Sequence, residues 1–212
     1  MEGCSVYFHQ SLLEKGHLEF LVLCANSDES LEGARISISD TQLALLRLAA
    51  EIVRKERKRP LDLGTCFLSV PSCLFLIALV TRIYREMQSG NQDEILAESL
   101  LTLLEILGDV SECIHAAEHT REALCTANII PICLMMLQDA SQGGHTEQLT
   151  MGVRGIKVLL VRIVGNFSYR HLPTQEQVKS LHGLELILNQ CKIDPSNECK
   201  LVQTPFLGFG PS

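Results

Sequence analysis

The sequence contains no tryptophan and few other aromatic residues. Aromatic side chains make up 5% of the 212 residues, whereas apolar residues as a whole make up 46%. The apolar content is therefore supplied mainly by leucine, isoleucine, valine and alanine, which suit helix-on-helix packing. The chain is long enough for one substantial domain or for a short array of repeats.

Positive charge is also in deficit. The formal net charge is −7 and the isoelectric point is near 5.5. Binding to nucleic acid depends on basic faces, so this balance argues against a nucleic-acid partner. Residues 1–4 (MEGC) do not begin a charged region followed by an apolar stretch, as a secretion signal would. We therefore expect the chain in the cytosol or the nucleus.

The nine cysteines include no C-x-x-C pair. Their number is odd and most lie within apolar runs, which is typical of free, buried thiols in a reducing compartment. None of them has the surroundings expected of a catalytic nucleophile. The sequence also lacks the glycine-rich motifs that bind phosphates, so we expect no cofactor.

One uncharged stretch, residues 63–80, approaches the length of a membrane span. A span needs about 20 apolar residues, and Gly64, Pro71 and two serines interrupt this stretch. We expect a loop that leads into a helix starting near Pro71 and buried on most sides. No membrane span is predicted.

Two segments carry a narrow polar stripe on an otherwise apolar helix. Residues 42–55 and 94–107 place these stripes at helical spacing, the first with Arg47, Glu51 and Arg54, the second with Glu94, Glu98, Thr102 and Glu105. A helix that is apolar over most of its circumference must be covered from several sides. Stacked helical repeats provide such cover.

Three apolar segments of five residues align without gaps and indicate an internal repeat. They begin at Leu18, Ile130 and Leu184, and a weaker fourth copy begins at Val70 and Pro71. A longer helix follows each copy except the last. The order of short helix, second helix and long third helix predicts an all-α fold, an armadillo/HEAT-like α-solenoid of about three to four repeats.

Short turns should separate the first and second helices of each repeat. Gly16, Asn128 and Gly183 lie near the expected bends, where residues of these types end helices.

The repeats predict one helical domain over residues 5–197. The last copy begins near Thr174 and no long third helix follows it. Residues 198–212 hold two prolines and two glycines within eight positions, which excludes a continuing helix, so we expect this tail to be disordered. Because a repeat cannot bury its apolar faces alone, an apolar face should be left open at this end.

Residues 160–197 carry a distinctive set beyond the repeat pattern. The set comprises the run LVRIVGN at 160–166, Tyr169, Gln175, Val178, Gly183, residues 186–188, Cys191 and residues 194–197. It resembles the C-terminal armadillo-like domain of the ataxin-10 family, and weaker similarity reaches back to about Leu12. After Asn197 the family continues with a helix that this sequence lacks. The tail 198–212 is therefore not of the family type, and the chain resembles a shortened or alternatively spliced form.

The resemblance implies a non-enzymatic armadillo scaffold or adaptor that mediates protein–protein interactions. It also implies links to neuron survival, neurite outgrowth, cytokinesis and cilia. We further expect other proteins as partners on the solenoid surface, a homo-oligomer as one form of assembly, and a cytoplasmic or perinuclear location.

One motif favours different chemistry. His115, Glu118 and His119 match H-x-x-E-H, in which two histidines one helical turn apart hold zinc and the glutamate acts as base. The alternative function is therefore a zinc-dependent hydrolase. A catalytic zinc needs a third protein ligand, and no further motif supplies one. We prefer the interpretation that this motif is a helix surface between repeats.

Two groups of basic residues are candidates for binding. Residues 54–59 (RKERKR) have the composition of a nuclear localisation signal or phosphate-binding patch, although cations are also expected at a helix C-terminus. Arg154, Lys157 and Arg162 form a predicted basic edge for an acidic partner segment. Asn166 follows in the same helix, where we expect it to bond to backbone between repeats.

Overall fold

A computed structural model describes residues 37–57, 68–90, 93–114, 117–141 and 152–190 of the chain. Within these ranges all regular structure is helical, which confirms the all-α prediction. The eight described helices are α3 (Asp40–Arg57), α4 (Val70–Gln88), α5 (Glu94–Cys113), α6 (Glu118–Thr126), α7 (Ile129–Ser141), α8 (Gly152–Ser168), α9 (Leu172–Ser180) and α10 (Gly183–Gln190).

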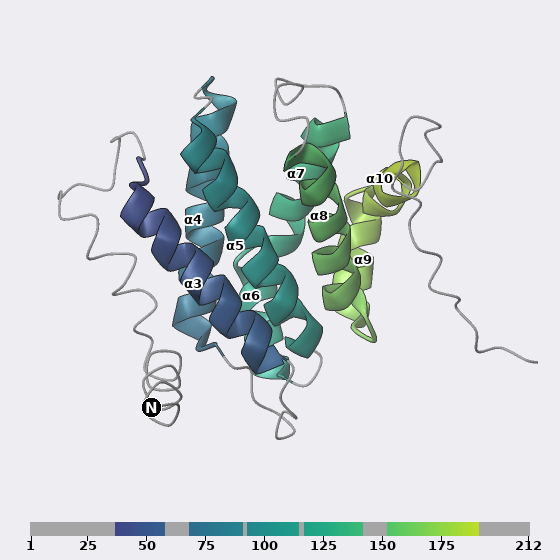
Figure 1. The fold of residues 1–212 in the computed structure, drawn as a ribbon. Helices are drawn as coiled ribbons and strands as arrows, with labels where there is room; N and C mark the ends of the chain where they lie inside the picture. The colour runs from purple at the N-terminus through teal and green to yellow at the C-terminus, as the bar shows by residue number, and fades with distance from the viewer. Residues whose placement is uncertain (1–36, 58–67, 91–92, 115–116, 142–151, 191–212) are drawn as a thin grey trace, which may run out of the picture.

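The helices stack into an array of repeats (Figure 1). The long helices α3, α5 and α8 lie side by side in one layer, and α5 packs against both of the others. In the second layer, α4 supports α5 and α7 supports α8. The third unit, α6–α7–α8, has the predicted order of short, second and long third helix. A fourth unit begins with α9 and α10, so the structure is the helical-repeat solenoid that the sequence predicted.

The first and second units are described only in part. Helix α3 is the long helix of the first unit, whose earlier predicted elements, Gly16 among them, lie outside the described residues. The second unit contains α4 and α5, and no short first helix precedes α4 within the described residues. The predicted domain boundary at Asn197 and the tail 198–212 also lie outside the described part.

Local sequence explains where α4 and α5 begin. The Ser69 hydroxyl accepts the backbone N–H of Ser72, and Pro71 occupies the first turn of α4, where a missing N–H costs nothing. The carboxylate of Asp93 caps α5 by accepting the N–H of Ile95 at 2.9 Å. The helix predicted to start near Pro71 is therefore confirmed.

A helix that spans a membrane is both long and apolar. Taken singly, none of the described helices is long and apolar enough to cross a bilayer. The pair α6 and α7 passes the same test of length and composition only when joined across its 58° bend.

The bends between first and second helices use left-handed backbone. Asn128 between α6 and α7 has φ 62°, and His182 between α9 and α10 has φ 56°. Asparagine tolerates this conformation well, whereas histidine adopts it less often. Gly183 lies at the second bend as predicted, yet His182 takes the positive φ. Gly183 is needed for a different reason, its close packing against neighbouring helices.

Helix α5 lies at the centre of the core. Most of its side chains are buried, and its largest fully buried residues are Leu96, Leu100, Leu103, Leu104 and Ile106. This confirms the prediction that the helix is apolar, and covered, over most of its circumference. One member of its predicted polar stripe differs, because Thr102 is buried and its hydroxyl donates to the backbone carbonyl of Glu98 at 2.9 Å.

Candidate protein-binding face

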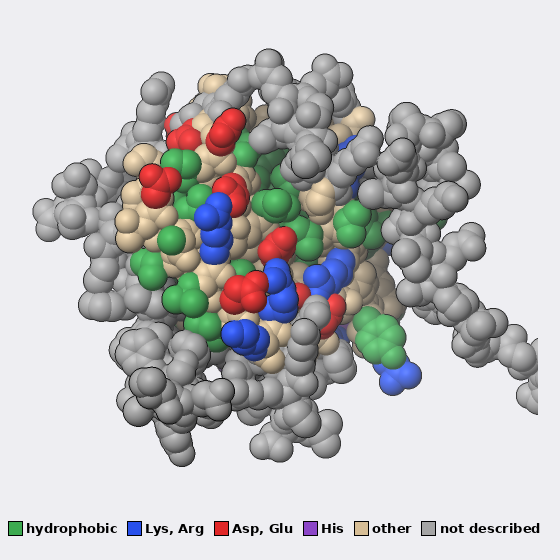
Figure 2. All heavy atoms as spheres, viewed as in Figure 1, with side chains coloured by type: hydrophobic (Ala, Val, Ile, Leu, Met, Phe, Trp, Pro, Cys, Tyr) green, Lys and Arg blue, Asp and Glu red, His purple; other side chains and the backbone are tan. Residues whose placement is uncertain are grey.

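The outward sides of α3, α5 and α8 form one continuous surface, which we call the outer face. Figure 2 shows it with basic and acidic side chains alternating across the three helices. Helix α5 carries five acidic residues and no basic residue. The basic residues that meet them come from α3 and α8, so charge pairing on this face runs between repeats.

Two arginines of α3 contact glutamates of α5. The guanidinium of Arg47 binds the carboxylate of Glu98, with its Nε donating at 3.0 Å. Two helical turns further along α3, Arg54 Nη2 lies 3.2 Å from Glu105 Oε2. Arg54 also pairs with Glu51 of its own helix. The two polar stripes that the sequence predicted separately therefore face each other across the α3–α5 junction.

Arg162 joins α8 to α5. Its Nη2 atom donates to Asp109 Oδ1 at 2.7 Å and to Glu112 Oε1 at 2.5 Å. Burial lowers the pKa of Arg162, but the bonds to both carboxylates outweigh this and raise it above its ordinary value. The Asp109 side chain is only 8% exposed, so this pair is better shielded from water than those of α3.

A glycine makes room for the Arg162 side chain. A Cβ atom on Gly108 would lie 3.3 Å from Arg162 Nη1 and 3.6 Å from its Cζ. The guanidinium therefore crosses the surface of α5 at the one position of that helix without a side chain.

Asn166 also bonds between repeats, although not to backbone as predicted. Its Nδ2 donates to the hydroxyl of Ser111 at 2.9 Å, and that hydroxyl donates to the carbonyl of Gly108 at 2.7 Å. The sequence predicted that Asn166 bonds between repeats but not that its partner is a side chain. The residue opposite Asn166 depends on the register in which α8 packs against α5.

Two members of the predicted basic edge, Arg162 and Lys157, lie on different sides of α8. Arg162 faces α5, whereas Lys157 lies five residues earlier, about 140° away around the helix axis. Lys157 is half-buried, and the side chain of Arg154 lies outside the described part. The partner-binding role of Arg154, Lys157, Arg162 and Asn166 stays a prediction.

Apolar side chains lie between the charged pairs of the outer face. Val158 of α8 is 51% exposed and stands one turn from both Gly155 and Arg162. Leu101 of α5 is half-buried, and its Cδ1 lies 3.5 Å from where a Cβ of Gly155 would be. Leu101 and Val158 therefore offer apolar contact area beside the α5–α8 junction, bordered by fixed charges.

The basic cluster at residues 54–59 lies at the end of α3. Arg54 is paired within the outer face, Lys55 is exposed, and α3 ends at Arg57. This position agrees with cations that complement a helix C-terminus. Residues 58 and 59 lie outside the described part, and a role in nuclear localisation stays a prediction.

The zinc motif is described only in part, because His115 is not among the described residues. Glu118 begins α6, where its carboxylate lies 3.7 Å from Arg121 Nη1 and 3.4 Å from His171 Nε2. His119 is exposed. Within the described ranges, no group of three histidine, cysteine or acidic side chains is placed to hold a metal ion.

We expect the purified chain to contain far less than one zinc ion per molecule, because no third ligand is placed beside His119 within the described ranges. Elemental analysis of protein purified without chelators measures this directly. Stoichiometric zinc that disappears in His119→Ala but persists in His182→Asn, which removes another exposed histidine, would favour the hydrolase instead.

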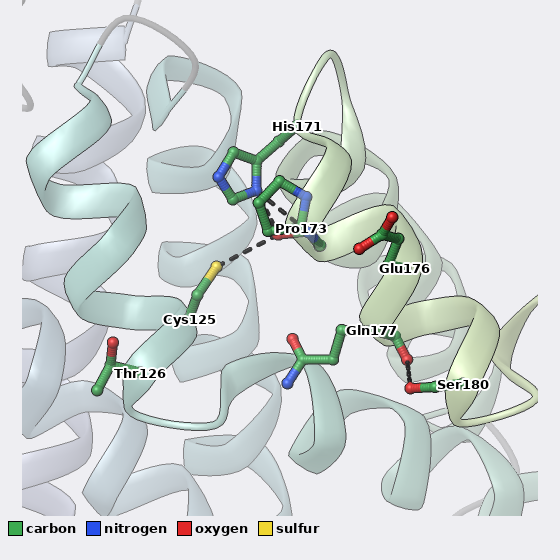
Figure 3. Close-up of a pocket in the computed structure, with 8 residues that line it drawn as sticks. Cys125, Thr126, His171, Pro173, Glu176, Gln177 and Ser180 are labelled. Carbon is green, nitrogen blue, oxygen red and sulfur yellow. Dashed lines mark hydrogen bonds between the residues drawn. The ribbon is translucent and has the colours of Figure 1, made fainter.

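A shallow pocket lies between α6 and α9 (Figure 3). Cys125 on α6 approaches the hydroxyl of Thr174 at 3.4 Å, and that hydroxyl lies 2.6 Å from His171 Nδ1. His171 Nδ1 also accepts the backbone N–H of Thr174 at 3.4 Å and so caps α9. Burial raises the pKa of the Cys125 thiol, which keeps it protonated and a weak nucleophile. We conclude that this cluster fastens α9 to α6.

His171 was missed by the sequence reasoning. Histidine is an unusual capping residue, since serine, threonine, aspartate and asparagine are preferred. Pro173, in the first turn of α9, was the available signal that a helix starts here.

The described cysteines are free thiols, as expected, and Cys133 is the most deeply buried of those with a shifted pKa. Burial raises its pKa from 9.0 to about 12. In the unfolded chain the thiol ionises near its ordinary value, so its protonated form supports folding below pH 9. This contribution is lost progressively as pH rises from 9 towards 12.

We therefore expect the stability difference between the chain and Cys133→Ala to shrink with rising pH. Between pH 8 and pH 10 the decrease should be about 1.4 kcal/mol. Urea unfolding of both proteins at the two pH values tests this. A difference that stays constant would contradict the shifted ionisation of Cys133.

Comparison with known proteins identifies relatives for part of the chain. The spinocerebellar ataxia type 10 protein domain matches residues 156–202. The ataxin-10 homolog of Dictyostelium discoideum is 37% identical over 54 residues, which are 26% of this chain and 9% of that protein. Ataxin-10 of Bos taurus is 32% identical over 95 residues, 45% of this chain and 18% of the relative. The homolog of Kluyveromyces lactis is 49% identical over 43 residues, 20% of this chain and 8% of the relative.

The chain thus spans less than a fifth of the length of these relatives. No solved structure matches it. The matched domain covers part of α8 and the whole of α9 and α10, so it includes Arg162, Asn166 and His171.

Proposed function

We propose that the chain, whose residues 156–202 match the spinocerebellar ataxia type 10 protein domain, is a non-enzymatic helical-repeat scaffold that binds other proteins through its outer face. The non-enzymatic part of the proposal is supported by the family, because the curated relatives are ataxin-10 proteins and homologs. The zinc hydrolase has no comparable support.

The observation that carries the proposal is the joining of α3, α5 and α8 across two repeat junctions. Stacked long helices present an extended surface on which a partner makes many small contacts. Arg47 and Arg54 pair α3 with carboxylates of α5, and the better shielded pair of Arg162 with Asp109 holds α8 to α5. The apolar pair Leu101 and Val158 then supplies contact area on a rigid support.

The cellular roles are proposed from the family resemblance. They are neuron survival and neurite outgrowth, cytokinesis and ciliary function, carried out with protein partners and a homo-oligomer as one form of assembly. A cytoplasmic or perinuclear location is part of the same proposal. Imaging of the tagged chain tests the location, and exclusion from the cytoplasm would contradict it.

Two matched variants test the binding face. Val158→Glu places a charge on the outer face, whereas Met135→Glu places the same charge on α7, where the side chain is 43% exposed. Partners captured from cells by the full chain should be lost with Val158→Glu and kept with Met135→Glu. Equal capture by both variants would contradict the assignment to the outer face. Circular dichroism should confirm that both variants fold.

A further inference from the structure

The exposed side of α8 contains a glycine that packing within the chain does not require. Gly165 lies inside the helix, and an added Cβ would meet no neighbouring atom within 4 Å. Three other described glycines have a clear reason, since Gly90 has a φ of 97° and Gly108 and Gly183 leave room for nearby side chains. Glycine weakens a helix relative to alanine. The close approach of another molecule is a physical reason to keep glycine at position 165.

Two exposed side chains with large apolar area flank Gly165 on the same side of α8. Val158 lies seven residues before it, and Tyr169, directly after the last helical residue, lies four residues beyond it. Both spacings return to one side of a helix. Val158 is 51% and Tyr169 53% exposed, and they are about 16 Å apart along the helix axis. We call Val158, Gly165, Tyr169 and Arg170 the α8 contact line.

Arg170 is a positioned cation at the end of the α8 contact line. It is exposed, and its Cζ lies 5.2 Å from the centroid of the Tyr169 ring, within the range of a cation–π contact. Its backbone has φ 51°, which arginine rarely adopts. On one side of the turn, the Tyr169 N–H donates to the Asn166 carbonyl at 3.3 Å. On the other, the His171 N–H donates to the Ser168 carbonyl, also at 3.3 Å. These bonds and the aromatic contact hold the guanidinium in place.

The guanidinium of Arg170 has donors available for a carboxylate. Within the described part of the chain it forms no hydrogen bond or ion pair, whereas Arg162 is engaged by Asp109 and Glu112. A ring covers one flat side of a stacked guanidinium and leaves the N–H groups at its edge accessible. A carboxylate binds two such groups at once. The net charge of −7 disfavours a polyanion such as nucleic acid, so a single carboxylate suits this position better.

We propose that an acidic segment of a partner protein lies along the α8 contact line. Its backbone approaches α8 most closely at Gly165, one of its apolar side chains covers Val158, and one of its carboxylates binds Arg170 beside the Tyr169 ring. The inference rests on the proposed function, because Val158 belongs to the outer face. It adds the chemistry of the partner and the direction in which the partner lies.

Binding of a synthetic peptide to the isotope-labelled full chain tests the proposal. The peptide is a helix of about 12 residues, long enough to span the line, with leucines along one side and aspartate at one end. A matched peptide has asparagine in place of aspartate. The amide chemical shifts of Gly165 and Tyr169, followed by NMR, measure both affinities. We expect the aspartate peptide to bind about fivefold more tightly, because it forms the charged bond to Arg170.

Three variants assign the binding to the α8 contact line. Arg170→Gln should abolish the preference for aspartate. Arg85→Gln is the matched control, since it removes the same charge from an exposed residue of α4, and it should keep the preference. Gly165→Ala should weaken the binding of both peptides roughly tenfold, because a methyl group then stands where the backbones approach. Alanine favours the helix, so this loss cannot come from unfolding.

Equal affinity of the chain for the two peptides would overturn the proposal. Loss of the preference in Arg85→Gln would also overturn it, by reducing the preference to an effect of net charge. Undiminished binding to Gly165→Ala would contradict the close approach at that residue. The capture experiment with Val158→Glu is read separately. Lost capture there without a peptide preference would leave the binding face in place and reject only the acidic partner.

Discussion

Replacing Gly183 with valine should destabilise the chain by about 3 kcal/mol, through overpacking where three helices meet. A Cβ atom at this position would lie 2.8 Å from Leu134 Cδ1 and 2.9 Å from Val178 Cγ1. Leu134 belongs to α7 and Val178 to α9, and both side chains are buried. Valine is stiff at its first torsion, so Val178 cannot turn aside easily.

The cost arises because the start of α10 approaches α7 and α9 too closely for any side chain. Gly183→Ala should therefore already cost about 1–2 kcal/mol. Urea unfolding monitored by circular dichroism measures both variants. In a Leu134→Ala background, which opens space beside Gly183, the penalty of Gly183→Val should fall.

Gly165→Ala is the control for these substitutions. Gly165 is an exposed residue of α8 with no neighbouring atom within 4 Å of an added Cβ. Alanine favours the helix more than glycine does, so this change should stabilise the chain by roughly 0.5–1 kcal/mol. If Gly183→Ala stabilised the chain as well, α10 could not pack against Leu134 as described.

Arg162→Met should cost about 2 kcal/mol, the second largest effect that we expect. The substitution leaves Asp109, 8% exposed, without its arginine partner. Breaking a buried ion pair costs about 3–5 kcal/mol, and the 28% exposure of the Arg162 side chain reduces this value. Methionine retains much of the aliphatic length, so the loss reports on charge and hydrogen bonding.

Two further variants separate the charge effect from general disturbance. Arg47→Met removes a pair whose side chains are 56% and 45% exposed, so it should cost less than about 1 kcal/mol. Asp109→Asn combined with Arg162→Met should recover part of the loss, because no buried carboxylate is then left without its arginine partner. Equal costs for Arg162→Met and Arg47→Met would show that Asp109 is not shielded from water.

The sequence predicted the helices well because their apolar periodicity is strong and local. The two polar stripes were recognised from spacing alone, and they lie at the α3–α5 junction. Spacing did not reveal that Arg47 meets Glu98, because that contact joins residues 51 positions apart. Such pairs depend on how one repeat registers against the next.

The candidate site on α8 was less accessible to prediction for the same reason. Arg162 and Lys157 looked alike as basic residues of one helix, yet only the packed structure shows that Arg162 faces α5. Gly183 was read as a residue of the bend, whereas His182 supplies the left-handed backbone. The glycine is required by side chains of two other helices, and no local pattern encodes that requirement.

Salt should weaken the charge pairs at the α3–α5 junction more than the pair at the α5–α8 junction. At physiological ionic strength the Debye length is about 8 Å, and exposed pairs are weakened more than shielded ones. Arg47 and Glu98 are about half exposed, whereas Asp109 is nearly inaccessible. The first unit should therefore tilt against α5 more readily than α8 does, and the curvature of the array changes mainly at its N-terminal junction. A partner that spans all three long helices would adjust its fit there, with α5 and α8 serving as the fixed part of its platform.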